Sequence, residues 1–158
     1  MGSASSAEKG RRTTFSPVRT GLFEKSVVGF VGAGVIGRIL FQQGKESGAQ
    51  AQQWQIDPVP NGSGLYHFVN AASGKRLDVA NASTENGANI QQWRANNFGA
   101  QEWIIEQHLD APGTVTIVSF ISGLLLEVES GSTDDGANVR QWEDTDSPGQ
   151  WWRLEPCS

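Results

Sequence analysis

Residues 87–93 read GANIQQW, and this stretch decides the fold because the chain repeats it. Residues 136–142 read GANVRQW, and residues 48–54 read GAQAQQW. The three tryptophans that end these stretches stand 39 and 49 residues apart, a period typical of repeat architectures. The sequence therefore predicts three copies of one structural unit.

The similarity extends upstream of each tryptophan. Residues 73–79, SGKRLDV, match residues 122–128, SGLLLEV, and residues 36–41, IGRILF, take the same place in the first copy. Short apolar runs alternate with turns rich in Gly, Ser and Asn, and the closing segments are QEW (101–103) and QWW (150–152). We expect units of about 27–62, 63–110 and 111–158 that close into an all-β, three-fold barrel, because closure removes exposed strand edges.

The composition agrees with short strands joined by polar turns. Of the 158 residues, 37% are hydrophobic and 18% are charged, while 19 are Gly and six are Trp. This mixture excludes a helical bundle, which is rich in Leu, Lys and Glu, and a disordered chain, which lacks aromatic residues. Cys157 is the single cysteine, so the fold has to be stable without an internal disulfide.

The charge is divided unevenly between the N-terminus and the rest of the chain. Residues 1–25 carry a net charge of +3 and the remaining residues a net charge of −8. An acidic body repels phosphate backbones, so nucleic acid is excluded as a partner. We expect residues 1–25 to be a flexible basic tail and residues 26–158 to be the folded domain.

The N-terminus carries no visible secretory signal, and residues 27–36 are too few to span a bilayer. Residues 1–6, MGSASS, fit a myristoylation pattern and equally an artificial start of the chain. The compartment therefore stays open between the cytoplasm and secretion by a route that uses no signal peptide.

A second pattern competes with the repeat. Residues 32–37, GAGVIG, follow the apolar run at 27–31, and Asp57 lies twenty residues further on, as in a dinucleotide-binding fingerprint. This pattern supports a third hypothesis, an NAD(P)-dependent oxidoreductase. Against it, residues 38–50 contain Gly44 and Gly48 where a helix is needed, and no alternation of strands and helices follows.

The Gly-x-x-Leu-Asp-Val, GANIQQW and Gln-x-Trp elements in combination resemble the ricin B-type lectins, which are β-trefoil carbohydrate-binding modules. The resemblance covers residues 27–156. It implies a non-enzymatic protein without cofactor or metal that binds glycans, of galactose or N-acetylgalactosamine type, in one shallow pocket per unit. The family also includes xylan binders.

The resemblance places the principal sugar site in the second unit. A carboxylate there would accept hydrogen bonds from sugar hydroxyls, an indole would cover the apolar face of the ring, and amides would complete the polar edge. The expected site residues are Asp78, Asn81, Gln91, Trp93, Asn97 and Gln101. Ala100 stands where the family usually has Asn, and either Asn96 or Asn97 could take that role.

The other two units depart from the pattern. In the third unit Glu127 replaces Asp and Arg140 replaces Gln, so Glu127, Arg140, Trp142 and Gln150 form a weaker second site at most. In the first unit Phe41 stands in the place of the acid and cannot accept a hydroxyl, so we expect this site to be inactive. No Gln-x-Trp follows Trp54 at the expected distance.

Structural interpretations stand beside the functional ones. Trp103 and Trp152 are expected in the core, because indoles bury a large area. His67 and His108 have no metal-ligand spacing and are expected to be ordinary strand residues. The alternative function, given two eroded sites and the basic tail, is a β-trefoil that binds a protein as an adaptor, an assembly subunit or a protease inhibitor.

Overall fold

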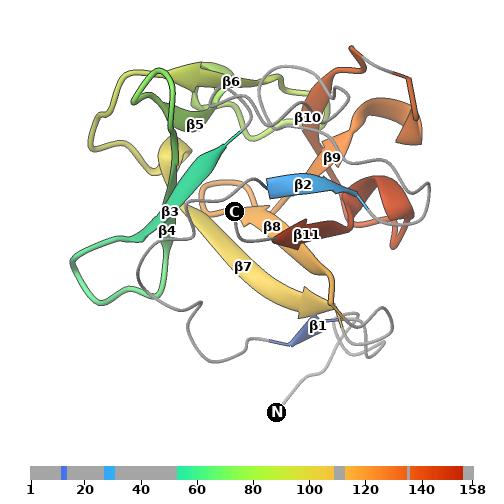
Figure 1. Cartoon of the computed structure of the whole chain (residues 1–158), viewed down its shortest axis with the longest axis horizontal. Coiled ribbons are helices and arrows are strands. Elements are labelled where there is room, and N and C mark those ends of the chain that lie inside the picture. Colours follow the sequence, from blue (N-terminus) through green and yellow to red (C-terminus); the bar gives the residue numbers. More distant parts are fainter. Residues whose placement is uncertain (1–11, 14–26, 31–52, 109–112, 135, 155–158) are drawn as a thin grey trace.

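The computed structural model describes residues 12–13, 27–30, 53–108, 113–134 and 136–154. They form one eleven-stranded sheet in which every pairing is antiparallel, and four single-turn 3-10 helices, η2 to η5 (Figure 1). The strands are β1 (Arg12–Thr13), β2 (Val27–Phe30), β3 (Trp54–Pro58), β4 (Tyr66–Asn70), β5 (Arg76–Val79), β6 (Ile90–Trp93), β7 (Trp103–His108), β8 (Val115–Ser119), β9 (Leu125–Val128), β10 (Val139–Trp142) and β11 (Trp152–Leu154). The helices are η2 (Ala80–Ala82), η3 (Gly99–Gln101), η4 (Glu129–Gly131) and η5 (Pro148–Gln150).

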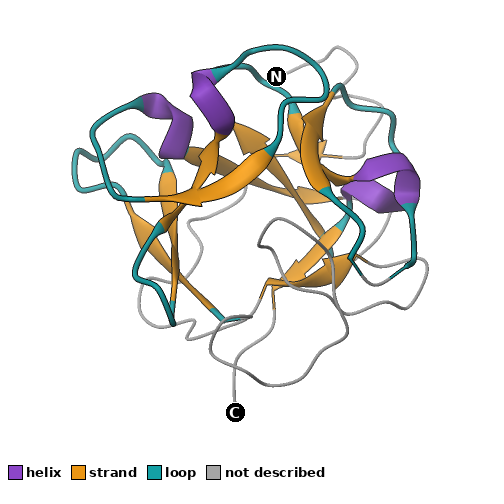
Figure 2. Cartoon of the chain, turned by 90° about the horizontal axis from the view of Figure 1, so that it is seen from above, coloured by secondary structure: helices purple, strands orange, loops and turns teal. Residues whose placement is uncertain are grey.

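The strand pairings repeat with three-fold pseudosymmetry. β3 pairs with β4, β7 with β8, and β11 with β2, so the last strand of each unit joins the first strand of a neighbouring unit. Within the units, β5 pairs with β6, and β9 with β10. Seen from above, the strands surround a central interior and the short helices lie at its periphery (Figure 2). The predicted all-β, β-trefoil fold is confirmed.

One tryptophan from each unit fills the core. Trp54, Trp103 and Trp152 are at most 1% exposed, and the predicted core role of the last two is confirmed. Trp103 Nε1 donates to the carbonyl of Leu77 at 3.1 Å, and Trp152 Nε1 donates to the carbonyl of Leu126 at 3.0 Å. Burying one indole contributes about 4–6 kcal/mol, so these side chains dominate the stability of a barrel that has no disulfide.

The register predicted for the first unit is wrong. Trp54 was aligned with Trp93 and Trp142, but it begins β3 and lies in the core, as Trp103 begins β7 and Trp152 begins β11. These three tryptophans stand 49 residues apart in each step. The backbone contact is also repeated, because the carbonyl of Gln53 accepts from Ala71 at 2.9 Å and that of Glu102 accepts from Phe120 at 3.0 Å.

Residues 48–54, GAQAQQW, match GANIQQW in sequence, but Gln52-Gln53-Trp54 is the closing Gln-x-Trp motif of the first unit. The alignment of Trp54 with Trp93 is therefore wrong. Strand pairing, and not the local match to GANIQQW, decides which positions are equivalent. The expected Gln-x-Trp after Trp54 is missing because Trp54 itself ends that motif.

The oxidoreductase hypothesis does not agree with this fold. A dinucleotide-binding domain needs a parallel sheet with crossover helices, whereas all strand pairings of the described residues are antiparallel. The motif at residues 32–37 itself lies outside the described residues.

The N-terminal tail, predicted to be flexible over residues 1–25, contains one short strand in the structure. Arg12 and Thr13 pair with His108 and Gln107 on β7, which offers backbone groups at its edge. The other residues of the tail lie outside the described part of the chain.

Candidate functional site

A pocket of about 340 Å³ opens on the second unit, between β5, η2, β6 and the segment that leads into η3. Its volume lies at the small end of the range for small-molecule sites, which is about 300–1,000 Å³. The lining residues are Asp78, Ala80, Asn81, Ala82, Gln91, Trp93, Asn96, Phe98 and Ala100. Of the six expected site residues, the structure brings Asp78, Asn81, Gln91 and Trp93 together at this pocket and leaves Asn97 and Gln101 outside its lining.

The Asp78 carboxylate is buried, with 5% of the residue exposed, and is held from two sides. Gln91 Nε2 donates to Oδ1 at 2.9 Å, and Gln101 Nε2 donates to Oδ2 at 3.0 Å. An ionised carboxylate has about four acceptor positions, so two bonds leave capacity on both oxygens. Asp78 is fixed in orientation and keeps acceptor positions for a donor in the pocket.

Gln101 is fully buried and lies behind the carboxylate. Its Nε2 also donates to the carbonyl of Arg94 at 2.8 Å, and its Oε1 accepts from the backbone N–H of Asn96 at 3.0 Å. One amide group therefore orients Asp78 and fixes the segment between β6 and η3. In this position Gln101 acts as a positioning residue for the pocket.

Two aromatic side chains at the pocket are more exposed to solvent than large apolar side chains usually are. Trp93 is 48% exposed and lies on the same side of β6 as Gln91, as the alternation of side chains along a strand predicts. Phe98 is 70% exposed and was not predicted. The signal in the sequence was an aromatic residue in the run Asn-Asn-Phe-Gly, which ends one residue before the Gln-x-Trp motif.

Amide side chains form the polar edge. Asn81 has a φ of 58°, a left-handed conformation that Asn tolerates better than most residues. Its side chain makes no hydrogen bond to another described residue. Asn96 lines the pocket and its Oδ1 accepts from the N–H of Phe98 at 2.9 Å, whereas Asn97 is exposed outside the lining. Of the two asparagines considered to replace the family's amide at Ala100, the structure therefore places Asn96 at the pocket.

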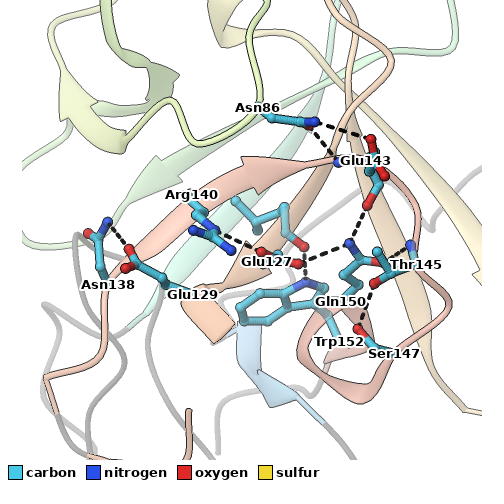
Figure 3. A network of polar contacts seen from close by, with 11 residues as sticks. Asn86, Glu127, Glu129, Asn138, Arg140, Glu143, Thr145, Ser147, Gln150 and Trp152 are labelled. Atoms are coloured by element: carbon cyan, nitrogen blue, oxygen red, sulfur yellow. Dashed lines mark hydrogen bonds and ion pairs between the residues drawn. The ribbon is translucent and has the colours of Figure 1, made fainter. Parts of the chain in front are cut away.

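The corresponding place in the third unit is occupied by the protein itself (Figure 3). Glu127 is 5% exposed, and its Oε2 accepts from Arg140 Nε at 2.8 Å. The Arg140 guanidinium also lies over the Trp142 ring, 4.1 Å from its centroid. The acid and the indole of this unit are both engaged by one cation.

The frame around Glu127 is the same as that around Asp78. Gln150 Nε2 donates to Glu127 Oε1 at 3.1 Å and to the carbonyl of Glu143 at 2.7 Å, while Gln150 Oε1 accepts from the N–H of Thr145 at 3.0 Å. Gln150 thus repeats the bonds of Gln101 to the acid, to a carbonyl and to a backbone N–H, and lacks only the contact of Gln101 Oε1 with Arg76 Nη1 at 3.5 Å. The two units differ in what fills the pocket, and not in how the pocket is built.

The first unit adds no site that the structure describes. Phe41, which was expected to make this site inactive, lies outside the described residues together with all of residues 31–52.

The described part of the chain gives little support for metal binding or for a helix that spans a membrane. No group of three or more His, Cys, Asp or Glu side chains there is arranged to hold a metal ion. No described helix has the length and apolar character needed to cross a membrane. His67 lies on β4 opposite Asp57, and burial together with the charge of Arg76 lowers its pKa below 6.5, while Asp57 opposes this effect.

The family described as "Ricin-type beta-trefoil lectin domain-like" matches residues 31–93, 50–142 and 99–158 of this chain. The chain belongs to the ricin-type β-trefoil lectin-like family. The carbohydrate-binding lectin fold and the internal repeat are therefore established, and the staggered matches reflect the three repeated units. No curated protein matches the chain closely in sequence.

Solved structures of this family agree. A designed three-fold symmetric protein, ThreeFoil, is 35% identical, with a TM-score of 0.68 over 85% of this chain and 94% of its own. An exo-beta-1,3-galactanase from Clostridium thermocellum is 27% identical, with a TM-score of 0.74 over 86% of this chain but only 31% of its own. A Macrolepiota procera ricin B-like lectin in complex with lactose is 16% identical, with a TM-score of 0.74 over 89% of this chain and 99% of its own, which shows a shared fold.

Proposed function

We propose that this protein is a non-enzymatic lectin whose principal site is the pocket of the second unit, and that its ligand is a glycan ending in galactose or N-acetylgalactosamine. The observation that carries the proposal is Asp78, a buried carboxylate held by two glutamine amides with acceptor positions left at the pocket. A carboxylate that is so desolvated, and whose remaining acceptor positions face the pocket, is best explained by a ligand that donates hydrogen bonds.

The surrounding side chains supply the rest of sugar recognition. The exposed face of Trp93 matches the apolar C–H face of a pyranose ring. Asn81 and Asn96 add amide groups at the rim, where other hydroxyls of the ring would lie. The lactose in the Macrolepiota procera lectin and the galactan-degrading activity named for the Clostridium thermocellum relative point to the same class of sugar.

We propose further that the third unit does not bind sugar in the native protein. A ligand would have to displace the Arg140 guanidinium from both Glu127 and Trp142 before it met either group. The cost of leaving a nearly buried carboxylate without its cation opposes this exchange.

The test is binding to an array of immobilised glycans with the wild type and Asp78→Asn. Removing the charge takes away charge-assisted hydrogen bonds worth about 1.5–3 kcal/mol, so the affinity for galactose-ended glycans should fall about 10- to 100-fold. Trp93→Ala, which changes an exposed side chain, should weaken binding without unfolding the barrel. Glu85→Gln, an exposed acid of the same unit outside the pocket, is the matched control and should bind normally.

The proposal fails if the wild type binds no galactose-ended glycan, or if Asp78→Asn and Trp93→Ala both bind as the wild type does. In that event the protein-binding alternative gains support, because the internally filled third unit is what an eroded lectin would show.

A further inference from the structure

Phe98 is the most exposed of the large apolar side chains in the described part of the chain. It is 70% exposed, compared with 52% for Phe120 and 48% for Trp93. A single exposed aromatic ring is unremarkable in itself, but this one lines the same pocket as Trp93 and Asp78. An apolar ring kept in water at the rim of a polar pocket calls for a physical reason.

The fold does not supply that reason, because the third unit builds the same loop without an aromatic residue. The position 49 residues after Phe98 is Ser147, in the labelled network of Figure 3. The backbone N–H of Gln101 donates to the carbonyl of Phe98 at 3.2 Å, and that of Gln150 donates to the carbonyl of Ser147 at 2.9 Å. The loop therefore accepts serine at this position, and the phenyl ring is an addition specific to the second unit.

The backbone of Phe98 is also connected to the carboxylate by hydrogen bonds. The Phe98 N–H donates to Asn96 Oδ1 at 2.9 Å, and the Asn96 N–H donates to Gln101 Oε1 at 3.0 Å. Gln101 in turn donates to Asp78 Oδ2 at 3.0 Å. This chain of hydrogen bonds preorganises the loop, so little ordering cost remains when a ligand contacts Phe98.

We propose that Phe98 forms a second apolar platform, which receives the sugar residue linked to the one that Asp78 and Trp93 hold. This inference rests on the proposed function and deepens it: the ligand is at least a disaccharide, and the pocket discriminates it from the single sugar. The first residue is held by polar contacts to Asp78, and the second residue contributes through the apolar contact of its ring face with the phenyl ring.

The test compares Phe98→Ser with the wild type by calorimetric titration with methyl β-galactoside and with two disaccharides, lactose and β-1,3-galactobiose. The serine copies Ser147, so the loop should keep its structure. Phe120→Ala is the matched control, because Phe120 is an exposed aromatic outside the pocket, and the position 49 residues before it is Ala71.

The wild type should bind at least one disaccharide on the order of tenfold more tightly than methyl β-galactoside, and Phe98→Ser should lose that preference. Phe120→Ala should keep the preference. The inference is overturned if the wild type shows no preference for either disaccharide, or if Phe98→Ser leaves the preference unchanged or weakens all three sugars equally. If the wild type binds none of the three sugars, the proposed function fails first, and the inference fails with it.

Discussion

Gln101 orients the acid of the second unit as Gln150 orients that of the third. The role of Gln101 was the hardest to predict from the sequence. Each amide is fully buried, donates to the acid of its unit and to a carbonyl, and accepts from a backbone N–H. The resemblance to the ricin B-type lectins predicted that Gln101 belongs to the site. It could not show that the side chain lies behind Asp78, because a motif specifies residue type and spacing but not the direction in which a buried amide is bonded.

Arg140 is the residue that separates a filled pocket from an open one. In the second unit the same strand position is Gln91, which donates to Asp78 Oδ1 at 2.9 Å and leaves Trp93 exposed. The double variant Glu127→Asp with Arg140→Gln copies this pair into the third unit and removes the cation from the Trp142 ring. We expect it to add a second site for galactose-ended sugars, which should bind lactose more weakly than the first site because Ser147 replaces Phe98.

Calorimetric stoichiometry measures this gain directly. The number of galactosides bound per chain should rise above the wild-type number in Glu127→Asp with Arg140→Gln, and Asp78→Asn in the same background should weaken the site of the second unit and leave the new site unchanged. An unchanged stoichiometry in a folded double variant would show that Arg140 is not what closes the third unit.

At the scale of elements, strand pairing explains both the success and the failure of the repeat analysis. The turn chemistry and the 49-residue spacing of the second and third units predicted β4 to β7 and β8 to β11 well, since both copies keep the same strands. The first unit was aligned in the wrong register, because the sequence that ends at Trp54 resembles GANIQQW, whereas Trp54 occupies the position of the Gln-x-Trp tryptophan. Only its place at the start of β3, paired with β4, distinguishes the two.

The hairpin of β3 and β4 carries His67, whose lowered pKa gives the stability of the fold a pH dependence. His67 has a pKa lowered mainly by burial, so the folded state resists its protonation. As the pH falls below about 6.5 the unfolded chain binds a proton at this side chain and the folded chain does not, until the folded pKa is reached. The free energy of unfolding should therefore decrease across this window.

His67→Gln should flatten that decrease. Denaturant unfolding at several pH values between about 7.5 and 5.5, for the wild type and the variant, compares the two slopes, and every other titrating group is common to both proteins. Parallel curves would show that protonation of His67 costs the folded state nothing.

For the whole molecule, the fold accounts for five of the six tryptophans in the composition. Three occupy equivalent core positions at the starts of β3, β7 and β11, and they stabilise a barrel without disulfides. Trp93 and Trp142 end β6 and β10, one exposed at an open pocket and one beneath Arg140. The three-fold frame therefore contributes to stability in every unit, whereas the pocket of the second unit is open and Arg140 fills the corresponding place in the third.

The most direct test of the assignment of sugar binding to the second unit is the number of galactosides that one wild-type chain binds. Calorimetric titration with lactose should give one site per chain, and Asp78→Asn should weaken binding at that site about 10- to 100-fold while the thermal unfolding transition stays cooperative. A stoichiometry of two or three, or one site whose affinity is unchanged in Asp78→Asn, would contradict the assignment of binding to the pocket of the second unit.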